Sequence, residues 1–184
     1  MTTLPAPNDP TYIREDGAAP LNAALSRTYT INWELAFYAV ILVLAIFTRF
    51  VNLGDRVMSH DESLHTKYSW DLFAKGIYLH TPLMHGPVLF HMTALDYFLF
   101  GDSDFSARIY PAVLGVIMVL MPPLLFRRWL KPYGAMAASV FILISPMLLY
   151  HHRYIREDTP AIFFTILMVY AMFILVPVAS YYIY

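Results

Sequence analysis

The sequence predicts an all-α integral membrane protein with four transmembrane helices. Of its 184 residues, 59% are hydrophobic and only 14% are charged, whereas soluble globular chains contain about 25% charged residues. Four stretches are also apolar enough to cross a bilayer, which takes roughly 20 residues per helix. Much of the protein surface therefore faces lipid rather than water.

Composition and charge exclude several function classes. A net charge of -1 provides no basic field that would collect nucleic acid. The chain has no cysteine, so it cannot form a disulfide framework, a thiolate zinc site or an iron–sulfur cluster. None of the histidines lies in the apolar centre of a predicted span, which disfavours haem ligation.

The first and fourth spans are the simplest to justify. Residues 31–51 have an unbroken apolar centre, with Glu34 and Arg49 near the two ends. Residues 159–184 have Pro160 in the first turn, where proline is tolerated, and end in a cluster of tyrosines typical of the membrane interface. Both segments are expected to be continuous helices.

Prolines interrupt the other two spans. Residues 109–126 contain Pro122 and Pro123, and residues 133–150 contain Pro146 one turn before their end. Because proline removes a helix hydrogen bond, both spans are predicted to be kinked.

The segments outside the spans differ in character. Residues 1–30 are rich in proline and small polar residues and lack the features of a signal peptide, so a flexible tail is expected before a membrane module at 31–184. The long loop 52–108 is predicted to carry two short amphipathic helices, at 63–75 and 88–100, which lie in the membrane interface.

Basic residues in a short loop predict the orientation. Arg127, Arg128 and Lys131 lie between the second and third spans, and positive charge in short loops marks the cytoplasmic side. Both termini are then cytoplasmic, and the loop 52–108 lies on the outer face of the cell inner membrane.

The first candidate cluster is Ser59-His60-Asp61-Glu62, just beyond the first span. One carboxylate can act as a base while its neighbour orients a cation or caps the following helix. A purely structural role is the alternative: Ser59 or Asp61 begins a helix, and Glu62 favours its first turn.

The second cluster is the segment 151–158, where one predicted helix ends and another begins. Arg156 has the geometry to bind a phosphate, and Asp158 can share a metal or a substrate with the first cluster. The structural alternative is interfacial snorkelling, with Asp158 as a helix cap. We expect both clusters to meet in one water-accessible crevice, with Arg108 at its edge.

No histidine pair has an established zinc spacing. His60 and His65 are five residues apart, as are His80 and His85, instead of three or four. A dedicated histidine metal site is therefore not expected, and a divalent metal held by the acids stays open.

Three motifs between Arg49 and Phe173 carry a resemblance to a known family. They read SHDESLHTKYSW, FGDSDFSARIYPAVLGV and YHHRYIREDTPAIFF. In this order they resemble the N-terminal part of the GT-C membrane glycosyltransferases. Specifically, they are similar to the dolichyl-phosphate-mannose protein mannosyltransferase-like proteins and, among these, to the flippase-activity-associated group.

The resemblance implies a polyprenyl-phosphate sugar as donor, transfer on the outer membrane face and inversion at the anomeric carbon. Asp61 and Glu62 match the acidic pair of the family's first outer loop, in which the first acid is the proposed base. Arg108, Arg156 and Asp158 match positions expected to face the donor phosphate or the first-loop acids. A carboxylate and arginines suit this chemistry, since sugar transfer needs a proton acceptor and stabilisation of the departing phosphate.

Family members normally continue through many more spans than these four. We therefore expect that this chain by itself does not transfer sugar. Two function classes stay open: a truncated glycosyltransferase module, and a non-catalytic accessory subunit of a larger respiratory or photosynthetic membrane complex. Membrane lipids and other membrane proteins, in a hetero-oligomer, are the expected partners.

Overall fold

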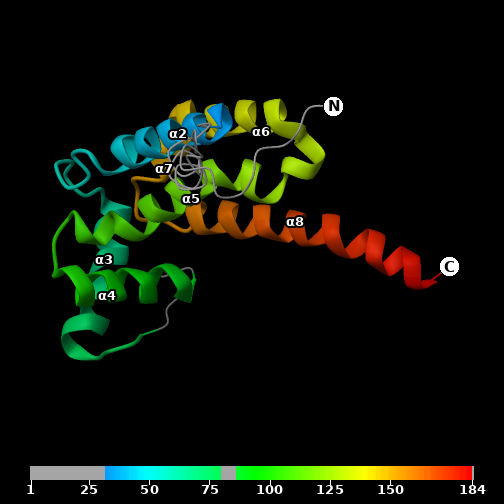
Figure 1. Ribbon diagram of the computed structural model, residues 1–184. Coiled ribbons are helices and arrows are strands. Elements are labelled where there is room, and N and C mark those ends of the chain that lie inside the picture. The colour runs from blue at the N-terminus through cyan, green and yellow to red at the C-terminus, as the bar shows by residue number, and fades with distance from the viewer. Residues whose placement is uncertain (1–31, 80–85, 184) are drawn as a thin grey trace, which may run out of the picture. The chain divides into compact units, whose positions relative to one another are not determined.

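The computed structural model describes residues 32–79 and 86–183, and every regular element within these ranges is a helix (Figure 1). Contacts divide the chain into two units, Met1–Leu35 and Ala36–Tyr184. The second unit contains the packed helices. The tail predicted at 1–30 and the pair His80 and His85 lie outside the described residues.

Three described helices are long and apolar enough to cross a membrane. They are α2 (Trp33–Phe50), α5 (Ile109–Leu125) and α8 (Asp158–Ile183), and the qualifying segments are Trp33–Phe50, Ser106–Leu125 and Asp158–Val176. They coincide with the first, second and fourth predicted spans. The prediction of membrane-spanning helices is thus confirmed for three segments rather than for four.

The third predicted span, 133–150, is interrupted at Ser145, directly before Pro146, where the sequence predicted a kink. That this segment crosses the membrane stays a prediction. Helix α6 (Arg127–Ile144) ends before Ser145, and a short helix α7 (Pro146–His151) begins there. Proline pushes the preceding residue towards extended backbone, and Ser145 has φ -60° and ψ 115°. Its hydroxyl then accepts a hydrogen bond from the N–H of Leu148 (3.4 Å) and caps α7. Pro146 therefore interrupts the span and starts a second helix.

The basic segment after α5 is helical rather than a loop. Helix α6 begins at Arg127, directly after Phe126, and the backbone leaves the helical region only at Lys131, with φ 59° and ψ 173°. Pro132 follows, and a residue before proline avoids the helical region. The predicted loop at Arg127–Lys131 is thus a helical turn that ends in a break.

Helix α5 is the centre of the packed unit, with α6 and α8 against it (Figure 1). Of the spanning window in α5, 56% is buried, compared with 11% in α8. One core cluster joins three helices through Ile41 and Ala45 of α2, Val119 of α5 and Leu143 of α6. The residues that α5 buries include Ala112 and Gly115. Their small side chains allow neighbouring helices to approach closely.

The loop between α2 and α5 folds into α3 (His60–Lys75), α4 (Pro87–Phe100) and the 3-10 turn η3 (Ser106–Arg108). Both helices form where amphipathic segments were predicted, and their location in the membrane interface stays a prediction. Asp96 of α4 accepts a hydrogen bond from the N–H of Tyr110 (2.9 Å). Because the first N–H groups of a helix lack internal partners, Asp96 caps α5 from another helix.

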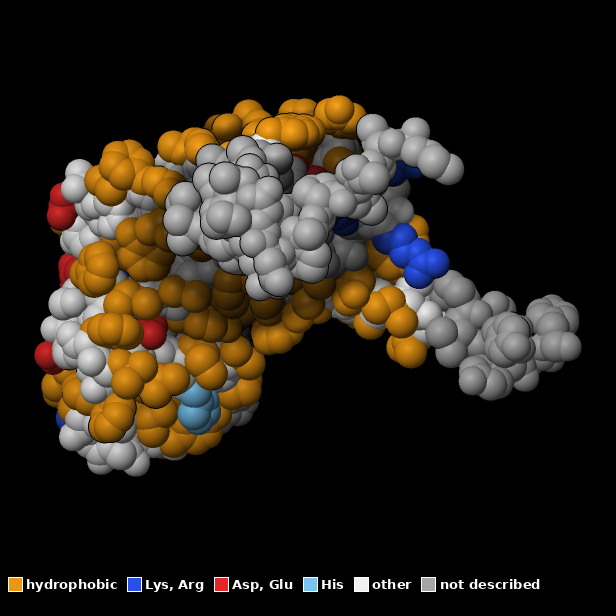
Figure 2. Space-filling view, in the orientation of Figure 1, with side chains coloured by type: hydrophobic (Ala, Val, Ile, Leu, Met, Phe, Trp, Pro, Cys, Tyr) orange, Lys and Arg blue, Asp and Glu red, His pale blue; other side chains and the backbone are white. Residues whose placement is uncertain are grey.

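Large hydrophobic side chains remain exposed on the outside of the helices. Figure 2 shows them over α2, α4 and the first part of α8, where examples are Phe47 (60% exposed), Phe98 (73%) and Met168 (58%). Exposure of this kind on helices of bilayer length fits contact with lipid.

Candidate functional site

The first cluster is built on a helix N-terminus. Ser59 is the N-cap of α3: its hydroxyl accepts a hydrogen bond from the N–H of Glu62 (3.3 Å), and the Glu62 carboxylate accepts one from the N–H of Ser59 (3.1 Å). This reciprocal arrangement is a capping box. The structural alternative stated for Ser59 and Glu62 is therefore correct. Asp61, in the same first turn, stays exposed.

Glu62 is the hub of a buried ion-pair network. Its side chain is fully buried, and its carboxylate accepts hydrogen bonds from Arg108 Nε (3.0 Å) and Nη2 (3.2 Å) and from Arg56 Nη2 (2.9 Å). Burial opposes ionisation, but the hydrogen bonds and the two guanidinium charges outweigh it and hold the pKa of Glu62 below its usual value. Glu62 is thus ionised, and both of its carboxylate oxygens accept hydrogen bonds from other residues.

The Arg108 side chain likewise makes all its hydrogen bonds within the protein. In addition to Glu62, its Nη1 donates to the carbonyls of Leu53 and Arg56, both at 3.0 Å, and the residue is 0% exposed. The guanidinium therefore joins the start of α5 to the connection after α2 and to the start of α3. The expectation that Glu62 and Arg108 face a water-accessible crevice is wrong, because they satisfy each other inside the fold.

The same network holds the segment between α7 and α8 beside α3. The N–H of Ile155 donates to Glu62 (3.4 Å), and the hydroxyls of Tyr154 and Ser59 are hydrogen bonded at 2.6 Å. The Arg56 guanidinium also lies 5.1 Å from the centre of the Tyr154 ring, within range of a cation–π contact. These contacts bring together two segments that are 93 to 95 residues apart in sequence.

Three predicted residues meet at the exposed edge of this network. Arg156 Nη1 lies 3.9 Å from Asp61 Oδ2, and Arg156 Nε lies 3.3 Å from Asp158 Oδ2. Their side chains are 54% (Asp61), 48% (Arg156) and 43% (Asp158) exposed. The convergence expected for the two clusters is therefore present for these three residues. We call them the ionic cluster.

Two histidines adjoin the ionic cluster. His151 Nδ1 lies 3.5 Å from Asp158 Oδ2, and His65 Nε2 lies 4.0 Å from Glu157 Oε2. Neither histidine nor Glu157 was assigned a role from the sequence. One signal was available for His65, since residues four apart on a helix share a face, and His65 follows Asp61 by four.

The arrangement combines a proton acceptor with a cation. Asp61 is an exposed carboxylate, and one guanidinium lies between it and a second acid. An arginine can bind phosphate oxygens with two parallel N–H groups. Within the described residues no three histidine or acidic side chains have the arrangement of a metal site, and the divalent metal left open by the sequence has no ligand set among them.

Three helices of bilayer length define an integral membrane protein, and the ionic cluster includes Asp158, the first residue of one of them, α8. The chain belongs to the dolichyl-phosphate-mannose-protein mannosyltransferase family, whose profile matches residues 84–183. That region includes Arg108, Arg156 and Asp158, whereas Asp61 and Glu62 precede it. The resemblance noted in the sequence is thereby confirmed at the level of the family.

A relative from Aquifex aeolicus (strain VF5), described as an uncharacterized protein, is 27% identical over 142 residues. The match covers 72% of this chain and 28% of the relative, so the chain spans less than a third of that protein's length. No solved structure matches this chain significantly.

Proposed function

We propose that this chain is the N-terminal module of a GT-C-type glycosyltransferase that uses a polyprenyl-phosphate sugar as donor. Membership of the mannosyltransferase family supports this class of reaction. The observation that carries the proposal is the ionic cluster, in which Arg156 lies between Asp61 and Asp158. Further segments of a longer protein would complete the donor pocket.

In this proposal Asp61 is the general base. Its carboxylate accepts the proton of an acceptor hydroxyl, whose oxygen attacks the anomeric carbon from the face opposite the phosphate. The bond between that carbon and the phosphate oxygen breaks, the electron pair leaves with the lipid phosphate, and the configuration inverts. Arg156 stabilises the charge that develops on the phosphate, and Asp158 holds the Arg156 guanidinium in place.

Glu62 and Arg108 have a different role in this scheme. The sequence assigned Glu62 to catalysis and Arg108 to the donor phosphate, but all their close contacts are within the protein. We propose that they are positioning residues. By anchoring the first turn of α3 and residue Ile155, they fix the distance between Asp61 and Arg156.

The expected setting of the reaction follows from the predicted orientation. We propose that the ionic cluster lies on the outer face of the cell inner membrane, with both chain termini in the cytoplasm, which requires α6 and α7 together to form a fourth crossing. This orientation requires the basic segment Arg127–Lys131 to be cytoplasmic. Membrane lipids then surround α2 and α8.

The test is sugar transfer by the tagged native protein, purified in mild detergent with its associated chains and supplied with polyprenyl-phosphate sugars from a membrane fraction. Asp61→Asn should lower turnover at least about 100-fold, the usual contribution of a general base. Asp55→Asn is the matched control, because Asp55 is an exposed acid in the nearby loop. Equal turnover in the wild type and Asp61→Asn would reject Asp61 as the base.

A non-catalytic subunit is the second candidate function, and α8 is the observation that favours it. Its candidate span is the least buried of the three and leaves an apolar surface that other membrane proteins can cover. Co-purification with other chains in fixed ratio, without any sugar transfer, would support this alternative. Transfer that depends on Asp61 would exclude it.

A further inference from the structure

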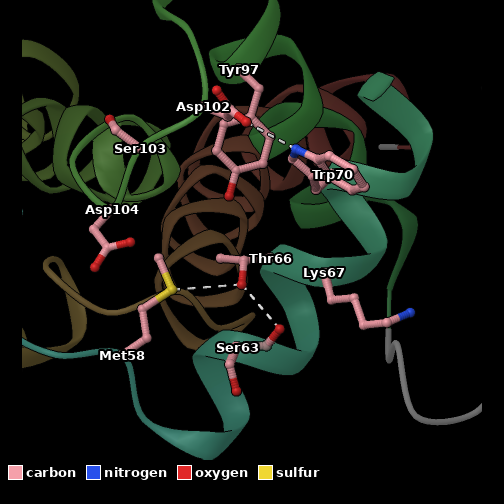
Figure 3. Close-up of a pocket in the computed structure, with 9 residues that line it drawn as sticks. All are labelled: Met58, Ser63, Thr66, Lys67, Trp70, Tyr97, Asp102, Ser103 and Asp104. Carbon is pink, nitrogen blue, oxygen red and sulfur yellow. Dashed lines mark hydrogen bonds between the residues drawn. The ribbon is translucent and has the colours of Figure 1, made fainter. Parts of the chain in front are cut away.

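A separate pocket lies between α3 and the turn that joins α4 to η3. It has a volume of about 370 Å³ and is open to the surface. Figure 3 shows its walls: Met58, one face of α3 from Ser63 to Trp70, Tyr97 of α4, and residues 102–104. None of the three residues of the ionic cluster lines it.

The pocket offers hydrogen-bond acceptors on one side. Asp104 is exposed and forms no hydrogen bond or ion pair with any residue that the structure describes. Asp102 accepts one hydrogen bond, from Trp70 Nε1 (3.0 Å), and a carboxylate has room for more. The two acids therefore present unused acceptor positions beside an aromatic side chain.

The pocket also offers a donor. The Tyr97 ring is buried, and its hydroxyl points towards Thr66 in Figure 3 without a hydrogen bond to the described part of the chain. Burial and the nearby charges of Asp104 and Asp102 raise the pKa of Tyr97, so the phenol keeps its proton and can donate. Ser103 also lines the pocket, but its hydroxyl is hydrogen bonded to that of Ser106 (3.0 Å).

These groups select against an anion. Lys67 contributes its side-chain stem to the wall, but its ammonium points away from the pocket and pairs with Asp71 at 3.1 Å. Without a cation facing inwards, two carboxylates repel a phosphate or a carboxylate ligand. A simple cation would be held by the two acids, whereas a ligand with hydroxyls can also accept a hydrogen bond from the Tyr97 phenol.

We propose that this pocket binds a neutral sugar residue. A pyranose presents hydroxyls that both donate and accept, which matches the acids and the phenol, and its C–H faces can pack against Trp70 and Met58. The inference goes beyond the proposed transfer reaction, because binding requires neither the lipid donor nor Asp61. Because the pocket is lined by none of Asp61, Arg156 and Asp158, it constitutes a second site.

The test is saturation-transfer NMR with methyl α-mannopyranoside and the full chain. A polyoxyethylene detergent is needed, because maltoside and glucoside detergents carry sugars. We expect saturable binding that weakens roughly tenfold in Asp104→Leu and in Tyr97→Phe, the usual effect of losing a hydrogen bond to a charged or buried group. Asp55→Leu and Tyr133→Phe, at an exposed acid and an exposed tyrosine outside the pocket, are the matched controls and should bind like the wild type.

Several outcomes would overturn the proposal. Binding that is absent, or equally strong in all four variants, would mean that no sugar occupies this pocket. Saturable binding of choline chloride or inorganic phosphate that is lost in Asp104→Leu, without sugar binding, would assign it to a charged ligand. Asp61→Asn separates the two proposals: it should abolish transfer and leave sugar binding unchanged.

Discussion

Arg108 and Glu62 form a buried ion pair with two hydrogen bonds, from Nε to Oε1 at 3.0 Å and from Nη2 to Oε2 at 3.2 Å. Both side chains are 0% exposed. The pair connects the first turn of α3 to the start of α5 across 46 residues of sequence. It therefore fixes the connection between α2 and α5 to the central helix, and with it the position of Asp61.

Removing one partner of this pair should destabilise the protein strongly. Glu62→Gln leaves Arg108 buried beside a neutral amide, and breaking a buried pair in this way typically costs about 3–5 kcal/mol. The free energy of unfolding in mixed micelles measures the loss. Lys67→Gln, at the exposed pair with Asp71, is the control and should have a much smaller effect. Similar losses in both variants would mean that the buried pair is not an anchor.

Asp96 should make the protein less stable as the pH rises through about 6. Burial raises the pKa of this carboxyl to about 6, even though the N–H of Tyr110 donates to it. Because the folded state holds the proton more tightly than the unfolded state, stability is greatest at low pH and falls on ionisation. Between the ordinary pKa of 3.8 and the raised value of about 6, the free energy of unfolding falls by about 2–3 kcal/mol, at about 1.4 kcal/mol per pKa unit.

The variant Asp96→Asn tests whether stability falls as the pH rises. An asparagine oxygen can still accept from Tyr110, but it does not ionise, so the variant should keep its stability between pH 4 and 7. Unfolding measured across this range should show the wild type declining and Asp96→Asn level, with Asp55→Asn following the wild type. Parallel profiles for the wild type and Asp96→Asn would show that Asp96 does not titrate in this range.

Gly115 and His152 form a contact that tolerates no extra atom. A Cβ on Gly115 would lie 2.5 Å from Cγ of His152, whose side chain is fully buried. Gly115→Ala should therefore cost about 1–3 kcal/mol, the usual effect of overpacking. Adding His152→Ala should recover part of this loss, because it removes the clashing ring. A double variant that is less stable than both single variants would place the effect of Gly115 elsewhere.

Sequence reasoning was most accurate where local signals decide the structure. The apolar runs of α2, α5 and α8 have the length of a bilayer, and Ser59 with Glu62 is a local capping pattern. At Pro146 the sequence predicted an interruption of the helix, but proline and hydropathy do not show whether the chain bends or breaks there. The conformation of Ser145 and its bond to Leu148 settle this point.

The candidate site was partly predictable for a different reason. Asp61, Arg156 and Asp158 were selected as exposed charges near span ends, and the structure brings them together. Arg108 and Glu62 looked equally available in the sequence. Their mutual pairing depends on how α3 packs beside α5, which is a tertiary contact that residue spacing does not reveal.

The predicted orientation can be tested by cysteine labelling, because the natural chain has no cysteine. Ser63 is exposed at the start of α3, and Tyr133 is 76% exposed just after the basic segment Arg127–Lys131. If that segment is cytoplasmic, an impermeant maleimide added to intact cells should label Ser63→Cys but not Tyr133→Cys. Both variants should react after the membrane is opened, which controls for access. Labelling of Tyr133→Cys alone in intact cells would reverse the orientation and place the ionic cluster on the cytoplasmic side, where outer-face sugar transfer is impossible.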